Sequence, residues 1–247
     1  MKTKIFLAVL TTTLLALGSV VAYADFTEVD DYAKDAVNAF TKEGILTESS
    51  LDAAVSAKRS DVIMWLMMSM DVEPLDKETP TYKDVKKSHK AYGYIEAATE
   101  MGIVEGDKDK DGKLLYTFRP SSQINRAEVA KILVLANKIK VDAPKKGTFK
   151  DVESTKWYYV YIEAAQKAGI VKGFSDKSGK PTGEFGPSKN VINQDAVLMI
   201  HRAATAKATV DADKTADKTA DKTADKTADK TADKTADKTA DKTADKT

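Results

Sequence analysis

The sequence has no cysteine, only two histidines and almost no net charge, and each absence excludes a class of structure or function. Without cysteine there is no disulfide, so a stable fold has to come from buried apolar surface. His89 and His201 lie in unrelated positions and leave almost no ligands for a zinc site. Because 39 basic side chains nearly balance 38 acidic ones, the chain has no electrostatic reason to bind nucleic acid.

Long apolar runs are also missing, apart from one at the N-terminus. Lys2 and Lys4 precede a largely apolar stretch, 5–21, which leads into the small-x-small pattern Ala22-Tyr23-Ala24. We interpret residues 1–24 as a signal peptide, with an uncleaved membrane anchor as the alternative. No later stretch is apolar over the length that crossing a bilayer requires. The sequence therefore predicts a secreted protein with no membrane span after cleavage.

Large apolar side chains are absent from the C-terminal segment, residues 211–247. From Ala212 to Thr247 the chain consists of successive Ala-Asp-Lys-Thr units. Each unit carries one acid and one base, and nothing more apolar than alanine, so burial cannot offset the entropy of folding. We expect a solvated, disordered or weakly helical tail without a partner.

The strongest positive signal is a segment that occurs twice, with corresponding positions 67 or 68 residues apart. Such self-similarity at a fixed period is typical of a repeat architecture. The matched ranges are 82–85 with 149–152, 94–98 with 161–165, 101–106 with 168–173, 118–120 with 185–187, and 124–129 with 192–197. A worn third copy precedes them, in which 26–29, 37–46 and 58–62 match. Only 15 residues separate Gly44 from Arg59, against 24 between Gly102 and Arg126, so the first copy lacks the Gly-rich loop.

Each copy has the pattern of a helix, a loop and a second helix, without alternating strand-length runs. Gly169 is placed to end a first helix, and Ser121 or Ser188 to cap a second. Residues 62–68 are apolar almost all round, which favours a central helix. We therefore predict an all-α fold, a pseudo-threefold bundle over residues 26–206. The central helices are expected near 60–70, 126–138 and 194–205.

These motifs resemble the S-layer homology (SLH) module. The resembling residues are the aromatic-x-Asp-Val start, Trp157, the Gly-Ile-x-x-Gly runs from Gly102 and Gly169, the Phe-x-Pro runs, and Ile124-Asn125-Arg126-Ala127-Glu128. The resemblance covers residues 26–76 as a degenerate first repeat, 79–141 as the second and 147–206 as the third. It implies noncovalent anchoring of a secreted surface protein to an anionic cell-wall polysaccharide, at the cell wall or cell surface. Self-association in a surface layer is a further implied interaction.

The resemblance also assigns ligand-binding residues. It places the family's Arg at Arg59 and Arg126, its Asp at Asp84 and Asp151, its Trp at Trp157, and its Gly at Gly106 and Gly173. An Arg fork can bind the carboxylate of a pyruvate ketal, and a Trp face can stack on a sugar. The alternative for the aspartates is that they cap the following helix, and for Trp157 that it packs.

If each groove joins the Arg of one repeat to the Asp and Trp of the next, the three grooves differ in completeness. Arg126 with Asp151, Trp157 and Gly173 is complete. Arg59 with Asp84 and Gly106 lacks an aromatic platform because Lys90 replaces the Trp. The third groove combines Gln194 with Glu28 and Tyr32 and lacks the cation.

Catalytic and metal-binding patterns are weak. The motifs of serine hydrolases, zinc proteases and P-loop proteins are absent, so we expect no enzyme activity and no cofactor. The run 107–112 opens like a calcium-binding EF-hand loop, but Phe118 stands where a bidentate Glu belongs, so we interpret it as a polar turn and expect no metal. The alternatives to wall anchoring are a self-assembling structural repeat protein and a secreted enzyme subunit that carries these repeats.

Overall fold

The computed structural model describes residues 29–47 and 51–206, and this part of the chain is helical. Its helices are α1 (Lys34–Lys42), α2 (Arg59–Ser69), α3 (Tyr92–Glu100), α4 (Arg126–Ala136) and α5 (Tyr159–Lys167), followed by a C-terminal helix that is described over 193–206. Within these residues there is no strand, only isolated β-bridges. The predicted all-helical fold with central helices near 60–70, 126–138 and 194–205 is confirmed. The proposed signal peptide, Glu28 and the Ala-Asp-Lys-Thr tail lie outside the described residues.

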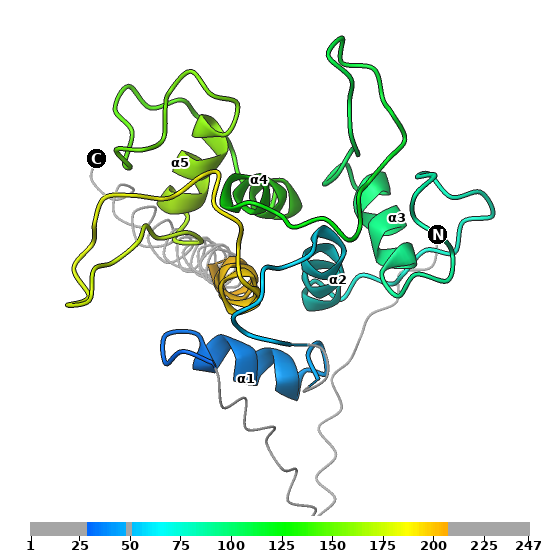
Figure 1. Ribbon diagram of the computed structural model, residues 1–247, viewed down its shortest axis with the longest axis horizontal. Helices are drawn as coiled ribbons and strands as arrows, with labels where there is room; N and C mark the ends of the chain where they lie inside the picture. The colour runs from blue at the N-terminus through cyan, green and yellow to red at the C-terminus, as the bar shows by residue number, and fades with distance from the viewer. Residues whose placement is uncertain (1–28, 48–50, 207–247) are drawn as a thin grey trace, which may run out of the picture.

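The helices pack in pairs that cross from one copy to the next. Helix α3 of the second copy packs on α2 of the first, and α5 of the third copy packs on α4 of the second. Helix α1 completes the cycle, since Phe40 meets His201 of the C-terminal helix edge to face at 6.0 Å between ring centroids. Figure 1 shows α2, α4 and the C-terminal helix in the centre, with α1, α3 and α5 outside them. No copy therefore buries its apolar faces alone.

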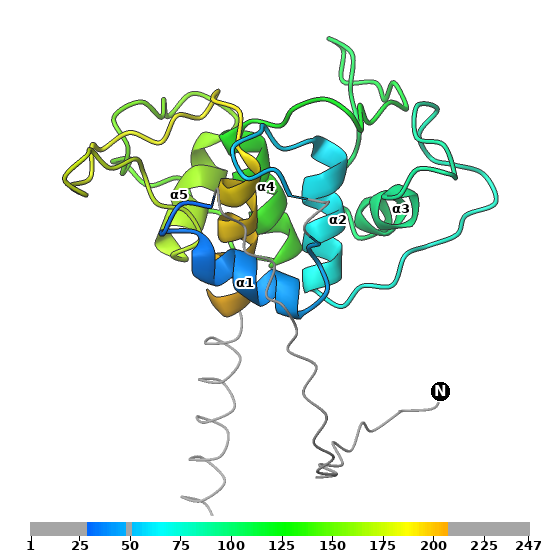
Figure 2. The same ribbon diagram turned by 60° about the horizontal axis from the view of Figure 1, so that its bottom comes forward.

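A ring of three backbone hydrogen bonds closes the bundle at the start of the central helices. Ala57 donates its N–H to the carbonyl of Val191 at 2.7 Å, Val191 donates to Ile124 at 3.0 Å, and Ile124 donates to Ala57 at 3.2 Å. These residues are spaced by 67 positions, so the ring relates the three copies by a pseudo-threefold axis. It lies at the end of the bundle where the loops gather in Figure 2.

Each central helix has its first free N–H groups satisfied by the loop of the next copy. Arg59 N–H donates to Ser122 and Ser60 N–H to Pro120. Arg126 and Ala127 donate in the same way to Lys189 and Pro187, and Asn193 and Gln194 to Val55 and Ala53. Because a helix N-terminus leaves several amide donors unpaired, these contacts stabilise the junctions between copies.

The ends of the outer helices follow the prediction, whereas the start of α4 does not. After α5, Gly169 has φ 75° and Ile170 donates its N–H to the carbonyl of Ala165, which is a Schellman ending. The predicted N-cap Ser121 is wrong. Asn125 is the N-cap of α4, in a capping box with Glu128, because the residues before it are held in the bridges between copies. Ser188 likewise lies five residues before the C-terminal helix begins.

Candidate functional site

Arg59 and Arg126 lie at equivalent junctions and are both buried, at 8% and 7% exposure. The Nε of Arg59 donates to the carbonyl of Phe118 at 3.0 Å, and Nη1 pairs with Glu128 at 3.3 Å. The Nε of Arg126 donates to the carbonyl of Phe185 at 2.8 Å, and Nη1 pairs with Asp195 at 3.4 Å. Each arginine therefore joins its copy to the loop of the next copy and to that copy's central helix.

The third junction carries no arginine, and the residue expected there is not Gln194. The backbone hydrogen bonds place Asn193 at the position of Arg59 and Arg126, one residue earlier than the sequence comparison predicted. Asn193 Nδ2 donates to the carbonyl of Asp52 at 2.8 Å, as the arginine Nε does elsewhere. Gln194 instead holds the first copy, since its Nε2 donates to Asp30 at 2.6 Å and to the Tyr32 hydroxyl at 3.1 Å.

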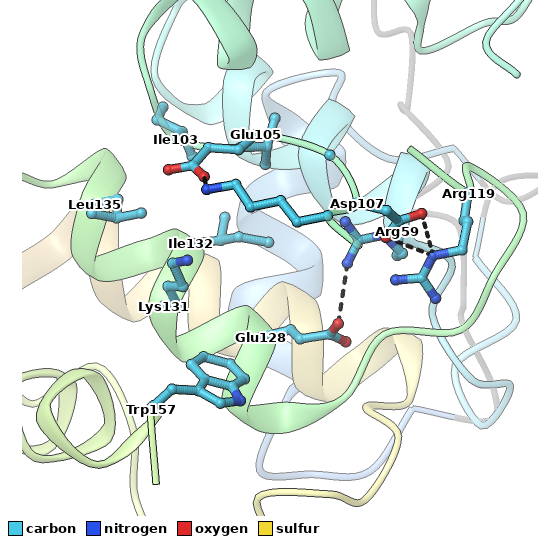
Figure 3. A pocket seen from close by; sticks show the side chains of 13 residues that line it. Arg59, Ile103, Glu105, Asp107, Arg119, Glu128, Lys131, Ile132, Leu135 and Trp157 are labelled. Carbon is cyan, nitrogen blue, oxygen red and sulfur yellow. Dashed lines mark hydrogen bonds and ion pairs between the residues drawn. The ribbon is translucent and has the colours of Figure 1, made fainter. Parts of the chain in front are cut away.

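A groove of about 630 Å³ opens at the Arg59 junction, and we call it the Arg59 groove. Figure 3 shows Glu128, Asp107 and Arg119 around the guanidinium of Arg59, with Trp157 farther away beside α4. Four cations and three carboxylates line it, together with apolar side chains of α4 and of the loop after α3. The lining residues are Arg59, Ile103, Val104, Glu105, Gly106, Asp107, Lys108, Arg119, Glu128, Lys131, Ile132, Leu135 and Trp157.

Trp157 lies in this groove, and its predicted grouping with Arg126 is wrong. Its side chain is 53% exposed, so it does not simply pack. The ammonium of Lys131 lies 5.8 Å from the Trp157 ring centroid and 5.6 Å from that of Tyr161. The physical reason is the exchange of outer helices between copies, which carries the start of α5 over α4 and toward the groove of the preceding junction. Trp157 therefore lines the groove of Arg59, for which the sequence predicted no tryptophan.

The side chains at the Trp157 position of the other two junctions are not tryptophans. At the Arg126 junction Tyr32 donates its hydroxyl to Asp195 at 2.7 Å. At the Asn193 junction Lys90 forms an ion pair with Asp61 at 2.8 Å. Since Asp61 and Asp195 are the counterparts of Glu128, the three junctions have the same plan with different residues. Within the described part of the chain, the Arg59 groove alone combines an arginine with a tryptophan.

Arg126 is enclosed more completely than Arg59. Its Cζ lies 4.7 Å from the ring centroid of Phe174 and 4.8 Å from that of Phe185, and Nη2 donates to the carbonyl of Lys172 at 3.3 Å. All three guanidinium nitrogens of Arg126 are therefore bound. The Nη2 of Arg59, by contrast, has no hydrogen-bond partner among the described residues. Burial lowers the pKa of both arginines, because desolvation disfavours the charged form.

Asp84 and Asp151 hold a loop rather than the following helix. Asp84 accepts the backbone N–H groups of Phe118 and Arg119 at 2.8 and 2.7 Å. Asp151 accepts those of Phe185 and Gly186 at the same two distances. The expectation that they cap the next helix is wrong. The carboxylates instead bind the N–H groups of the Phe-x-Pro turn, to whose carbonyl each arginine donates.

Gly106 and Gly173 are needed for close packing at the rim of each junction. A Cβ on Gly106 would lie 2.5 Å from the Tyr82 ring and 2.7 Å from the carbonyl oxygen of Thr117. A Cβ on Gly173 would lie 2.6 Å from the carbonyl oxygen of Glu184. Gly106 also lines the Arg59 groove. Because it has no side chain, backbone atoms form the rim of the groove at this position.

Sequence reasoning missed several functional and structural side chains. Buried Glu96 accepts both the N–H and the hydroxyl of Thr81, and Glu163 does the same with Thr148. Their identity in both copies was visible as Ile-Glu-Ala-Ala. The pair of Asp107 and Arg119 was also missed. In it, Arg119 Nε donates to both carboxylate oxygens of Asp107 at 2.9 Å. No repeat signal marks this pair, because the third copy has other residues there.

Hydrogen bonds shift the pKa values of three side chains that line the groove. Burial alone would raise the pKa of Asp107, but hydrogen bonds from Arg119 and Thr117 lower it overall. The hydrogen bond to Asp107 raises the pKa of Arg119. A hydrogen bond from Lys108 lowers the pKa of Glu105. Asp107, Arg119 and Glu105 therefore remain ionised near neutral pH.

The loop that opens like an EF-hand is built as a turn. Asp109 Oδ1 accepts the N–H groups of Asp111 and Lys113 at 3.0 and 2.9 Å, as Asp176 accepts those of Ser178 and Lys180. Over 29–47 and 51–206 there is no group of three or more His, Cys, Asp or Glu side chains placed to bind a metal. No helix in the same residues is long and apolar enough to cross a membrane.

Comparison with known proteins gives a family for these repeats. The sequence model of the S-layer homology domain matches residues 81–130 and 148–196, which include the loops of the Arg59 and Arg126 junctions. The first copy lies outside those ranges, and its assignment as a degenerate repeat stays a prediction.

Several curated proteins are similar over the same region. The "Surface-layer 125 kDa protein" of Lysinibacillus sphaericus is 27% identical over 79% of this chain and 16% of its own length. The "Cellulosome-anchoring protein" of Acetivibrio thermocellus is 29% identical over 60% of this chain and 32% of its own. An "Endoglucanase" of a Bacillus species is 30% identical over 58% of this chain and 14% of its own. The chain thus spans a third or less of the length of these relatives.

Proposed function

Because this chain is an S-layer homology domain protein, we propose that it anchors a secreted protein noncovalently to an anionic cell-wall polysaccharide at the cell surface. The observation that carries the proposal is the Arg59 groove. It holds a buried guanidinium with an unpaired Nη2 at one end and the exposed ring of Trp157 at the other. A carboxylate-bearing sugar matches both ends.

Two physical effects favour such a ligand. A desolvated guanidinium that is only partly neutralised gains a charge-assisted hydrogen bond when a carboxylate arrives, and such bonds are about twice as strong as neutral ones. The ring of Trp157 offers an apolar face for a sugar, although Lys131 shares that face. Glu128 does not compete freely for Arg59, since its other oxygen accepts the N–H of Asn125 in the capping box.

The relatives support anchoring as the shared role of this region. One is named for a surface layer and one for anchoring a cellulosome, while the endoglucanase points to enzymes that carry the same module. We assign binding rather than catalysis to the chain itself, because every carboxylate of the groove is held in an ion pair. Glu128 pairs with Arg59, Asp107 with Arg119 and Glu105 with Lys108. Self-assembly in a surface layer without glycan binding is the competing function.

The test is cosedimentation with purified cell walls, before and after chemical removal of the attached polysaccharide. We expect the protein to sediment only with untreated walls, and Trp157→Ala to weaken that association. Leu115→Ala is the matched control, because Leu115 is 42% exposed and does not line the groove. Equal sedimentation with stripped walls, or none with untreated walls, would exclude this function.

A further inference from the structure

Arg119 adopts a backbone conformation that an arginine rarely accepts. Its φ is 59°, in the left-handed region, and the third copy has Gly186 with φ 71° at the equivalent position. A side chain in this region costs conformational energy that glycine avoids. Strain of this kind persists where the surroundings enforce it and is concentrated at binding sites. The second copy therefore bears a local cost to place a guanidinium at the rim of the Arg59 groove.

The residue that faces position 119 is exchanged together with it. Asp107 pairs with Arg119 in the second copy, and its counterpart in the third copy is Phe174. A Cβ on Gly186 would lie 2.6 Å from the Phe174 ring, so Phe174 requires glycine there. The guanidinium of Arg126 lies over the rings of both Phe174 and Phe185. At the Arg59 junction the guanidinium of Arg119 is exposed to solvent, whereas at the Arg126 junction the ring of Phe174 covers the guanidinium of Arg126.

The exposed guanidinium is preorganised and incompletely paired. Both hydrogen bonds to Asp107 come from Nε, and neither Nη1 nor Nη2 of Arg119 has a partner in the described part of the chain. Its side chain is 49% exposed. In Figure 3 the guanidinium groups of Arg119 and Arg59 lie next to each other beside Glu128. Their mutual repulsion contributes to the lowered pKa of Arg59, which burial dominates.

We propose that Arg119, positioned by Asp107, is a second ligand-binding cation of the Arg59 groove, and that it selects a saccharide carboxylate lying between the two guanidinium groups. Phe174 closes the equivalent site at Arg126, so each chain binds one acidic saccharide unit. This inference rests on the proposed wall-binding function. It extends that function by naming the residue pair, 107 with 119, that distinguishes an open junction from a closed one.

Titration calorimetry with two probes tests the inference. The first probe is an acidic oligosaccharide released from purified wall polysaccharide, and the second is the same material with its carboxyl groups reduced to alcohols. For the unchanged protein we expect one site per chain and tighter binding of the acidic probe. Arg119→Gly should lower the affinity for the acidic probe by about tenfold or more, as expected for a lost charge-assisted hydrogen bond. It should leave the affinity for the reduced probe unchanged.

Three further variants, Lys113→Ala, Asp107→Asn and Arg59→Ala, test whether the loss of affinity is specific to the pair of Asp107 and Arg119 and to the groove. Arg119→Gly installs the residue that the third copy already has in this conformation, so folding is not at risk. Lys113→Ala removes one exposed cation of the same loop outside the groove, and we expect it to bind the acidic probe normally. Asp107→Asn should weaken binding of the acidic probe alone, which a purely structural role would not do. Arg59→Ala should weaken it as well.

The possible failures are distinguishable. If the unchanged protein binds neither probe, the proposed function fails with the inference. If it binds the acidic probe and Arg59→Ala abolishes this while Arg119→Gly does not, only the role of Arg119 is overturned. Two sites per chain would overturn the closure of the Arg126 junction by Phe174.

Discussion

Arg59 and Arg126 occupy equivalent positions and make the same contacts through Nε and Nη1, yet they differ at Nη2. That nitrogen of Arg126 donates to the carbonyl of Lys172, whereas Nη2 of Arg59 is unpaired among the described residues. Arg126 also contacts two phenylalanine rings and Arg59 one. The arginine of the Arg126 junction is therefore fully used in structural contacts, whereas Arg59 keeps one nitrogen that can donate to a ligand.

This difference predicts opposite effects of two alanine substitutions. Arg126→Ala should lower the free energy of unfolding by about 3 kcal/mol, because it removes buried hydrogen bonds and leaves carbonyls unpaired. Arg59→Ala should cost less stability but most of the wall binding. Urea denaturation and cosedimentation on the same preparations measure both quantities. The sequence alone led to the reverse ranking for binding. A folded Arg59→Ala variant that binds walls normally would restore that ranking.

Asp151→Ala should reduce stability without reducing binding of the folded protein. Two charge-assisted hydrogen bonds to the Phe-x-Pro turn are lost, and we expect a cost of about 2 kcal/mol in the free energy of unfolding. Asp84→Ala should behave alike, since its two hydrogen bonds are the same. Thermal unfolding followed by circular dichroism gives the stability, and wall binding well below the midpoint gives the second value. A loss of binding without a loss of stability would mean that the carboxylates contact the ligand.

The ring of hydrogen bonds predicts which amides exchange most slowly. The N–H groups of Ala57, Ile124 and Val191 belong to three different copies but to one closed set of contacts. Their exchange should require global unfolding, so all three should show the same opening free energy. Hydrogen exchange followed by NMR measures each amide separately. Distinct opening free energies for the three would show that the copies unfold independently.

The pair of Asp107 and Arg119 predicts a stability loss in acid. The pKa of Asp107 lies below its ordinary value of 3.8 in the folded protein, so its stabilising effect is fully present above that value. It is lost as the pH falls through the lowered pKa. The difference in unfolding free energy between the unchanged protein and Asp107→Asn should therefore be constant near neutral pH and shrink below pH about 4. Urea denaturation over this range checks it, and a difference that does not change with pH would exclude the pairing.

Much of the fold was predictable because short-range sequence patterns, such as helix-ending glycines and apolar runs, mark the helices of each repeat. Gly169 ended its outer helix as expected, and the apolar run 62–68 identified a central helix. The register of the third copy was not predictable in the same way. Ile192-Asn193 looks like Ile124-Asn125, which shifts the comparison by one residue and promotes Gln194. In the structure the two helices align by their acidic third residue instead, so that Asp195 matches Glu128 and Asn193 matches Arg126.

The composition of the grooves was the harder problem. Arg59, Gly106 and Trp157 were all identified as site residues from the sequence, but Trp157 was grouped with Arg126 instead of Arg59. Grouping them required knowing that outer helices pack on the preceding copy, which depends on long-range packing of α5 on α4. Arg119 was overlooked for another reason. The repeat pairs it with Gly186, but the sequence does not show that both residues adopt a left-handed backbone conformation.

The closed ring of Ala57, Ile124 and Val191 also fixes how this architecture can change in length. In an open solenoid each unit touches only its neighbours, so units are added or removed one at a time. Here the third copy accepts from the first and donates to the second, and neither an extra copy nor a missing one leaves the donors and acceptors of the cycle matched. Viable gains and losses of such modules should therefore occur in sets of three. An intermediate number would leave an unpaired face, available for pairing with another chain.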